Sequence, residues 1–429
     1  MHDLNNLRAP EEISTRLVSP VSYNNPDQVH RDLSWLRMNA PISLINAPNI
    51  DPFWCVSRHS DILEIERRPD VFRNGDRSTV LIARPMIDAV MGLTGSPHLV
   101  RSMVNMDGGE HRQFRSLAQP WFTPANVRKL TETIRAIART HVDRMIARDG
   151  ECDFVADVAL HYPLHVIMSI LGVPEADEGR MLTLTQQLFG ARDPELSRKS
   201  EAMSDPATAI GIFQSVLGDF YGYFSEISSA RREEPTGDFA TVIANAVIGG
   251  RPITDREAND MYILVATAGH DTTSASTSGA MWALAQRPHL LDQIKERPSL
   301  IPALVEEAIR WVTPVKHFMR TAAADCEING HQFRSGDWIM LSYMSANRDE
   351  SVFSDPFEFR VDRSSNQQVA FGYGPHVCVG QHLAKLEMTI LFEELLPRIR
   401  TLELNGEGAW TQSNFVSGPK RLPIRFSPA

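Results

Sequence analysis

Cysteine is scarce in this 429-residue chain, and its four cysteines, Cys55, Cys152, Cys326 and Cys378, show no paired C-x-x-C spacing. Neither a disulfide framework nor a zinc cluster is therefore expected. The sequence also lacks any run of eighteen apolar residues, and it begins with polar residues, so we expect neither a membrane anchor nor a signal peptide. Together these absences predict a protein of the reducing cytoplasm.

An excess of positive charge is also missing. Lys and Arg number 43 against 53 Asp and Glu, which gives a formal net charge of −10. This balance argues against nucleic acid or an anionic membrane as the main partner. Hydrophobic residues at 42% and charged residues at 22% are typical of a soluble globular protein. No linker, repeat or low-complexity segment interrupts the chain, so we expect one monomeric domain over residues 1–429, with an irregular arm at 1–24.

The most informative stretch is Phe371-Gly-Tyr-Gly-Pro-His-Val-Cys378-Val-Gly380, which precedes an apolar helical run from Gln381. A thiol just before a helix N-terminus is expected to have a lowered pKa and to bind a cation as thiolate. Gly374 and Gly380 permit positive φ or the close approach of a flat group, and Phe371 supplies an aromatic wall beside the sulfur. A buried free cysteine before a core helix is the alternative interpretation.

The pattern Phe-x-x-Gly-x-x-x-Cys-x-Gly resembles the haem-ligand loop of cytochrome P450, in which a cysteine thiolate binds haem iron. The resemblance implies that Cys378 ligates the iron of haem b, with Phe371 and Gly380 beside the cofactor. It also implies a mainly α fold with small β-sheets. In that fold the haem is buried between a long central helix and the cysteine-ligand loop with its helix.

A long helix is predicted from a capping box, Thr254 and Glu257, and it can run without proline to Pro288. At the helical rise it is about 50 Å long and must cross the molecule. Its apolar middle is followed by Ala268-Gly-His-Asp271-Thr272-Thr273. A buried acid needs a partner, and the Thr272 hydroxyl can bond the carbonyl of residue 268, which loosens the helix at Gly269.

This six-residue stretch resembles the oxygen-activation motif of the family, in which the acid and the alcohol deliver protons. The resemblance implies that Asp271 and Thr272 are catalytic and that Ala268 borders the haem. A helix that turns polar where it reaches the surface is the alternative.

Several charged residues are candidates for structural or cofactor contacts. His111 and Arg115 lie four residues apart on one helical face, so both could reach one anionic group, although a surface ion cluster is the commoner arrangement. By resemblance, these two residues, Arg320 and His376 bind the haem propionates. Glu307 and Arg310 likewise resemble the structural ion pair of the family, which does no chemistry.

Two segments are expected to cover the substrate pocket. Residues 80–106 carry many apolar side chains between glycines and a proline, and the resemblance makes them a flexible roof, with plain core as the alternative. Residues 186–223 are expected to be helical, with breaks at Gly190, Pro206 and Gly211. By resemblance they form a mobile lid.

The expected substrate is small and apolar because the candidate pocket residues offer no charge to anchor an ionic group. These residues are Leu264, Thr267, Ala268, Val315, Phe415 and Val416. The motifs Ala-Gly-His-Asp-Thr-Thr-Ser and Pro-Val-Lys-x-Phe-Met-Arg-Thr are most similar to the soluble bacterial, terpineol-hydroxylating branch of the family. We therefore expect a cyclic monoterpene or an alkyl-substituted aromatic hydrocarbon as substrate.

No flavin- or nicotinamide-binding fingerprint accompanies these motifs, so electrons must come from outside the chain. We expect O2 as co-substrate and an iron–sulfur ferredoxin with its reductase as partner, which docks on Arg112, Arg115 and Lys385. Two rival functions are a peroxide-driven hydroxylase and a haem-thiolate sensor without turnover. The acid and alcohol at Asp271 and Thr272 argue against both.

Overall fold

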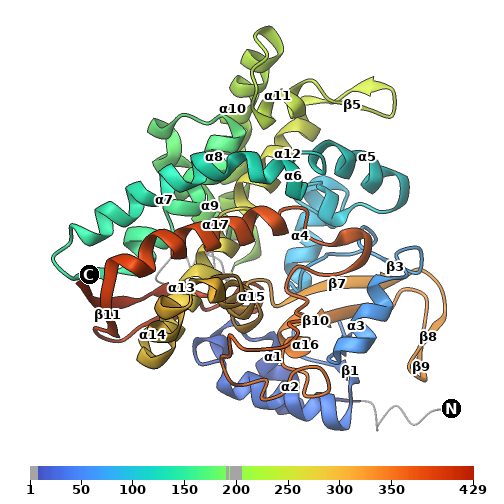
Figure 1. Cartoon of the computed structure of the whole chain (residues 1–429). Helices are drawn as coiled ribbons and strands as arrows, with labels where there is room; N and C mark the ends of the chain where they lie inside the picture. Colours follow the sequence, from blue (N-terminus) through green and yellow to red (C-terminus); the bar gives the residue numbers. More distant parts are fainter. Residues whose placement is uncertain (1–7, 190–192, 194–204) are drawn as a thin grey trace.

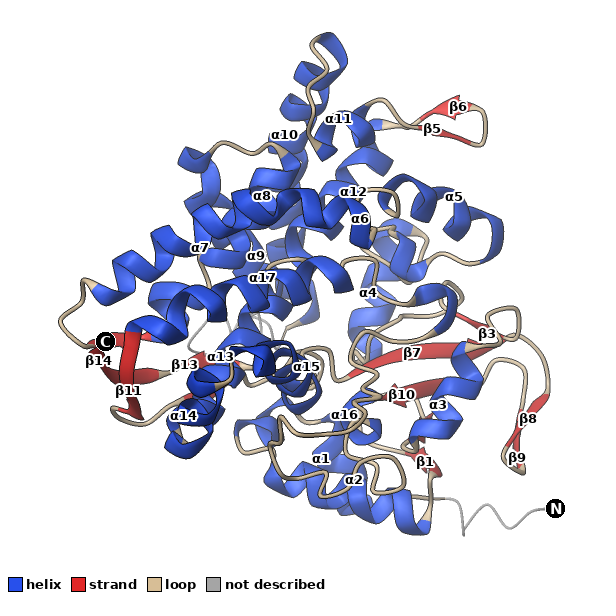
Figure 2. Cartoon of the chain, viewed as in Figure 1, coloured by secondary structure: helices blue, strands red, loops and turns tan. Residues whose placement is uncertain are grey.

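Helices dominate the fold; the largest sheet and the sheet that contains β11 lie on opposite sides of it, and the β5–β6 hairpin projects beside α11 (Figures 1 and 2). The structure is a computed structural model that describes residues 8–189, 193 and 205–429. The predicted fold class, mainly α with small β-sheets, is confirmed.

The helices and strands have the following bounds. The helices are α1 (Glu11–Val18), α2 (Asp27–Asn39), α3 (His59–Glu66), α4 (Arg84–Thr94), α5 (Gly108–Ala118), α6 (Pro124–Val127), α7 (Thr131–Ile146), α8 (Tyr162–Leu171), α9 (Glu178–Phe189), α10 (Pro206–Glu233), α11 (Phe239–Ala244), α12 (Asp255–Ala268), α13 (Asp271–Ala285), α14 (Pro288–Glu296), α15 (Ile301–Val312), α16 (Tyr343–Ala346) and α17 (Gln381–Leu395). The largest sheet has the order β1 (Ile42–Ile45), β2 (Phe53–Val56), β10 (Trp338–Ser342), β7 (His317–Ala322), β3 (Phe72–Arg73). A second sheet has the order β11 (Ile399–Leu404), β14 (Pro423–Pro428), β4 (Glu151–Asp153), and three two-stranded hairpins pair β5 (Val247–Ile248) with β6 (Arg251–Pro252), β8 (Cys326–Ile328) with β9 (His331–Phe333), and β12 (Ala409–Trp410) with β13 (Pro419–Arg421).

The N-terminal segment is more regular than predicted. Where an irregular arm was expected at residues 1–24, α1 and a 3₁₀ helix at Pro20–Asn24 are formed, and residues 1–7 lie outside the described part. Ile13 and Leu17 are one helical turn apart and both are buried in the core that also contains Leu33. This apolar stripe holds α1 against α2, which explains why the segment is helical.

The central helix begins as predicted but is not continuous. Thr254 and Glu257 form the capping box that opens α12, which ends at Ala268. Gly269 and His270 separate it from α13, so the helix does not run continuously to Pro288 and is interrupted at the glycine where the sequence predicted it to loosen. A Cβ at Gly269 would lie 2.9 Å from Cγ1 of Ile167, so α8 can approach the helix this closely only at a glycine.

The predicted break at Gly211 is also wrong, because α10 runs unbroken through that residue. Pro206 is the first residue of α10, where proline is tolerated, and Gly190 lies outside the described residues. Beneath α10 lies α4, from which Met86 and Val90 pack against Ala209 and Ile210. Within the predicted roof at 80–106, α4 therefore packs against another helix.

Candidate active site

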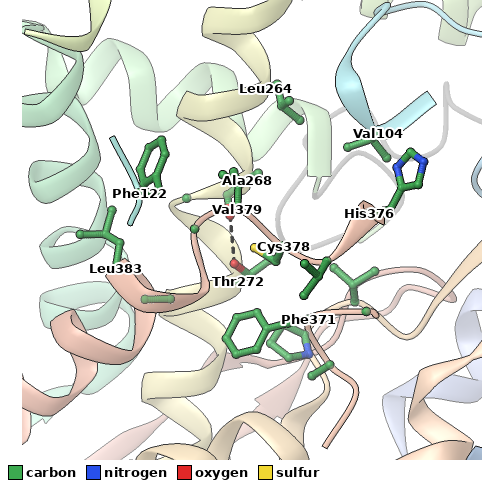
Figure 3. Close-up of a pocket in the computed structure, with 18 of the residues that line it drawn as sticks. Val104, Phe122, Leu264, Ala268, Thr272, Phe371, His376, Cys378, Val379 and Leu383 are labelled. Atoms are coloured by element: carbon green, nitrogen blue, oxygen red, sulfur yellow. Dashed lines mark hydrogen bonds between the residues drawn. The ribbon is translucent and has the colours of Figure 1, made fainter. Parts of the chain in front are cut away.

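A cavity of about 230 Å³ lies between the α12–α13 pair, the loop that carries Cys378, and the start of α17. Figure 3 shows the labelled side chains around it. The cavity brings together most of the site residues predicted from the sequence: His111, Arg115, Leu264, Ala268, Thr272, Val315, Arg320, Phe371, His376, Cys378 and Gly380. These residues are up to 269 positions apart in the sequence, so the fold alone unites them.

The Cys378 loop is held in shape by backbone contacts. The N–H of Cys378 donates to the carbonyl of Phe371 at 2.8 Å, which closes the loop. Gly374 has φ +66°, and a Cβ there would lie 2.3 Å from the backbone oxygen of Glu66, so only glycine fits. Gly380 is the N-cap residue of α17 and has an ordinary φ of −84°, so the positive φ considered for it is not used.

Cys378 is exposed, and the space to which it is exposed is the cavity that it lines. Its desolvated surroundings raise its pKa, while the backbone N–H groups of Gly380 and Gln381 and the charge of Arg115 act in the opposite direction. The expectation of a lowered pKa is therefore wrong for this thiol by itself, because burial outweighs the helix N-terminus. The N–H groups are nevertheless in place to stabilise a thiolate once a cation binds the sulfur.

Two histidines and two arginines line the same cavity. Burial lowers the pKa of His111, and its Nε2 has no hydrogen-bond partner among the described residues. The Arg115 guanidinium makes no ion pair or hydrogen bond within the part of the chain that the structure describes. Arg320 donates from Nη2 to Oε1 of Glu66 at 3.1 Å. Burial, followed by the charges of Arg320, His111 and Arg115, lowers the pKa of His376 to about 2.

The break in the central helix places one member of the predicted acid–alcohol pair in the cavity. Thr272 lines the cavity, and its hydroxyl donates to the carbonyl of Ala268 at 2.9 Å, as predicted (Figure 3). The neighbouring Asp271 does not line it. Its Oδ1 lies 3.4 Å from Nδ1 of His270, and burial raises the pKa of its carboxyl group, which the charge of His270 partly opposes.

The substrate side of the cavity agrees with the prediction only in part. Leu264 and Val315 line it, but Thr267, Phe415 and Val416 do not. The Thr267 hydroxyl donates back to the carbonyl of Ile263 at 2.6 Å, within its own helix. Phe415 packs edge-on against Phe318, which does line the cavity, and Val416 forms a bridge with Val315. These two residues therefore support the wall of the cavity from behind.

Glu307 and Arg310 form the predicted ion pair on α15, and both side chains are completely buried. Their carboxylate and guanidinium are joined by two hydrogen bonds, of 2.8 and 2.7 Å. Arg363 also donates to Glu307, at 3.0 Å, and Arg310 donates from Nη1 to the carbonyl of Asn347 at 2.7 Å. The cluster ties α15 to the segment before the Cys378 loop and does not reach the cavity.

Sequence reasoning missed several residues that line the cavity. They include Asn74, Phe122, Ile167, Tyr343, Leu383 and Glu387. Asn74, Phe122, Ile167 and Tyr343 belong to no short motif, whereas Leu383 and Glu387 lie one turn apart on α17, just after the Cys378 loop. Of the predicted roof at 80–106, only Met103 and Val104 line the cavity.

These residues suit a haem, a flat macrocycle with two carboxylates and an iron that takes a sulfur ligand. Among the described residues Cys378 is the one cysteine that lines the cavity, and the cavity wall around it is mostly apolar. The partnerless nitrogen of His111 and the unpaired guanidinium of Arg115 lie in the same cavity, where a bound carboxylate would satisfy both. No cluster of three or more His, Cys, Asp or Glu suited to a metal ion occurs elsewhere in the described ranges.

Comparison with known proteins leads to the same family that the Cys378 loop resembles. Residues 78–424 match the cytochrome P450 family. Cytochrome P450-terp of a Pseudomonas species is 44% identical over 98% of each chain, and linalool 8-monooxygenase of Pseudomonas putida is 34% identical over 94% of this chain and 98% of its own. The crystal structure of CYP108D1 from Novosphingobium aromaticivorans superposes with a TM-score of 0.91 at 43% identity, covering 98% of this chain and all of that one.

The match to cytochrome P450-terp confirms the branch predicted from the sequence. Among the residues that the structure describes, no helix is long and apolar enough to cross a membrane. The family binds haem, and its related monooxygenases are oxidoreductases that incorporate oxygen from O2. The chain therefore belongs to the cytochrome P450 family.

Proposed function

We propose that this protein hydroxylates a small apolar substrate, a cyclic monoterpene or an alkyl-substituted aromatic hydrocarbon, with O2 and two electrons from a ferredoxin. Substrate R–H, O2, two electrons and two protons yield R–OH and water. The observation that carries the proposal is the wall of the cavity near the helix break. There, Leu264, Val315 and Phe318 present only apolar side chains beside Thr272.

Haem, when bound, supplies the activation of O2 and the oxidising power for the C–H bond. The residues of the protein position the haem and deliver protons. Cys378 would hold the iron, and His111, Arg115, Arg320 and His376 would hold the two carboxylates. Thr272 would pass a proton from its hydroxyl to oxygen at the reaction centre, and Asp271 would return a proton to that hydroxyl.

The relatives support the substrate class. Linalool 8-monooxygenase is named for a small apolar alcohol, and cytochrome P450-terp has the higher identity to this chain. An uncharged wall recognises such a ligand by apolar contact, whereas a fatty acid would leave its carboxylate without a cation on that wall.

The redox partner would dock through exposed basic side chains. Arg112 is exposed on α5. Lys385 on α17 pairs with Glu306 at 2.6 Å and lies 5.3 Å from the centre of the Phe371 ring, next to the Cys378 loop. Arg115 was expected to share this role but instead lines the cavity. Charge reversal at Arg112 and Lys385 should slow reduction by an acidic ferredoxin, and unchanged turnover would contradict this docking site.

Titration of the haem-loaded protein with candidate substrates tests the proposal. A cyclic monoterpene should displace the Soret band toward high-spin iron, and a ferredoxin-driven reaction should then give its alcohol. A linear fatty acid of similar carbon number is the matched comparison and should give no shift. Absence of a Soret shift with every monoterpene and alkyl aromatic would contradict the substrate class.

The same protein can be tested for the two rival functions. Full activity with hydrogen peroxide alone would favour a peroxide-driven hydroxylase, and tight binding without product would favour a sensor. Monomeric state and cytoplasmic location stay predictions.

A further inference from the structure

Asp107 stands at the N-cap position of α5, yet its carboxylate bonds no N–H group of that helix. It accepts instead from the backbone N–H of Asn74, at 3.0 Å to Oδ1, and of Gly75, at 2.8 Å to Oδ2. Nδ2 of the Asn74 side chain donates a third bond to Oδ1, at 3.2 Å. The loop after β3 is thereby fastened to the start of the helix that carries His111 and Arg115.

The amide nitrogen of Asn74 has a second partner. Its Nδ2 lies 2.9 Å from Nε2 of His376, and the Asn74 side chain is buried and lines the cavity. An amide nitrogen carries two hydrogens, so it can donate one to Asp107 and the other to His376. The flipped amide would place its oxygen against the Asp107 carboxylate, which also only accepts. The contact with Asp107 therefore fixes which end of the amide faces His376.

Nε2 of His376 is consequently the acceptor in this contact. A neutral imidazole that accepts at one nitrogen carries its proton on the other, so Nδ1 is the donor. The ring is also held in plane by His111, whose ring centre lies 4.0 Å away at an interplanar angle of 27°. Orientation and tautomer of His376 are thus both set by neighbours that precede it by more than 260 residues.

We propose that Asn74, oriented by Asp107, is a positioning residue that holds His376 in its Nδ1–H tautomer for donation to a carboxylate of the bound haem. The proposal rests on the cofactor-binding role proposed above for His376. It assigns to Asn74 and Asp107 a task that no sequence motif marks. Neither residue needs to change charge for the task, because the amide and the carboxylate act as fixed donor and acceptor.

The tautomer can be read directly in the unmodified protein. The reduced, carbon monoxide-bound holoprotein is prepared with ¹⁵N-labelled histidine, and the His376 signal is assigned by its loss in His376→Ala. One-bond and two-bond nitrogen–proton correlations then report which ring nitrogen carries the proton. We expect the proton on Nδ1 alone. A proton on Nε2, or on both nitrogens, would overturn the proposal regardless of the haem-release rates of the variants described next.

A double-mutant cycle tests the consequence for cofactor retention, measured as the rate of haem transfer to apomyoglobin. Asn74→Ala should release haem about tenfold faster, the scale of one hydrogen bond to a charged group. Asn259→Ala is the matched control, since Asn259 is also buried and donates from Nδ2 to Ser225 but does not line the cavity. It should release haem at the wild-type rate.

In the His376→Ala background the Asn74→Ala change should add less than about twofold, because the ring that Asn74 orients is gone. Equal acceleration in both backgrounds would overturn the proposal and leave Asn74 as a loop contact only. The outcomes also separate this inference from the proposed function. Loss of the thiolate-haem spectrum in the wild type contradicts the function, whereas an intact spectrum with the wrong tautomer contradicts only the role of Asn74.

Discussion

His270 and Asp271 face each other at the break in the central helix, with Nδ1 of the histidine 3.4 Å from Oδ1 of the acid. Nε2 of His270 lies 2.7 Å from the carbonyl of Leu160 and must donate to it. Nδ1 is therefore the ring nitrogen that faces Asp271. Burial raises the pKa of Asp271, and its Oδ2 has no hydrogen-bond partner among the described residues. The raised pKa and the partnerless Oδ2 support the proposal that Asp271 delivers protons beside Thr272.

Replacement of Asp271 by Asn should slow product formation about 100-fold, because the amide keeps the shape but cannot pass on a proton. Haem binding and the substrate-induced Soret shift should be unchanged. The rate of product formation under single-turnover conditions measures the effect. Asp292→Asn, an exposed acid on α14, is the control and should behave as wild type. A D271N variant as fast as wild type would remove Asp271 from proton delivery.

Replacement of Thr272 by Ala should divert electrons from product to hydrogen peroxide. The hydroxyl that now donates to the carbonyl of Ala268 is the one polar hydrogen this residue can turn into the cavity. We expect product formed per electron consumed to fall roughly tenfold, and Thr272→Ser to retain most of the coupling. Thr277→Ala, on the same helix but away from the cavity, should leave coupling intact. Unchanged coupling in T272A would favour a peroxide-driven enzyme.

Replacement of Glu307 by Gln should destabilise the fold by about 3–5 kcal/mol, because Arg310 would keep a fully buried charge without its counter-ion. The free energy of unfolding from urea titration measures the loss. Asp325→Asn breaks a surface pair with Arg334, in which both side chains are mostly exposed, and should cost less than about 1 kcal/mol. Equal losses in the two variants would show that the Glu307 cluster is not structural.

Acid should destabilise the protein partly through His141. Burial lowers the pKa of His141 to about 4 from an ordinary value of 6.5. As pH falls below 6.5, His141 becomes protonated in the unfolded chain but stays neutral in the folded chain. The free energy of unfolding that His141 contributes is therefore fully present above pH 6.5 and is lost between pH 6.5 and about pH 4. The loss from this group is about 3 kcal/mol. His141→Leu should therefore show a shallower fall of Tm between these pH values, and parallel Tm curves would contradict the assignment.

Local patterns were sufficient to predict several short-range contacts in and around the candidate site. The capping box of Thr254 and Glu257, the bond from Thr272 to Ala268, and the Glu307–Arg310 pair each depend on residues within four positions of one another. Whether such short-range contacts form depends mainly on residues a few positions away and little on the rest of the fold. The Cys378 loop could likewise be predicted from the sequence, because its glycines and its hydrogen bond to Phe371 lie within ten residues.

Long-range contacts decided everything that sequence reasoning missed. The sequence predicted that the helix loosens at Gly269, but it did not show that Ile167 of another helix packs against that glycine. The lowered pKa expected for Cys378 did not hold, because the desolvation comes from elements far along the chain. Asn74 reaches His376 across 302 positions, and no spacing rule reports such a contact.

The central claim is the bond between Cys378 and haem iron, and the spectrum of the reduced protein under carbon monoxide tests it most directly. We predict an absorption band at about 450 nm, the mark of thiolate-ligated haem, in the wild type and in Cys326→Ala, whose cysteine lies outside the cavity. The band should vanish in Cys378→Ala. Its absence from the wild-type protein, or its survival in Cys378→Ala, would contradict the account.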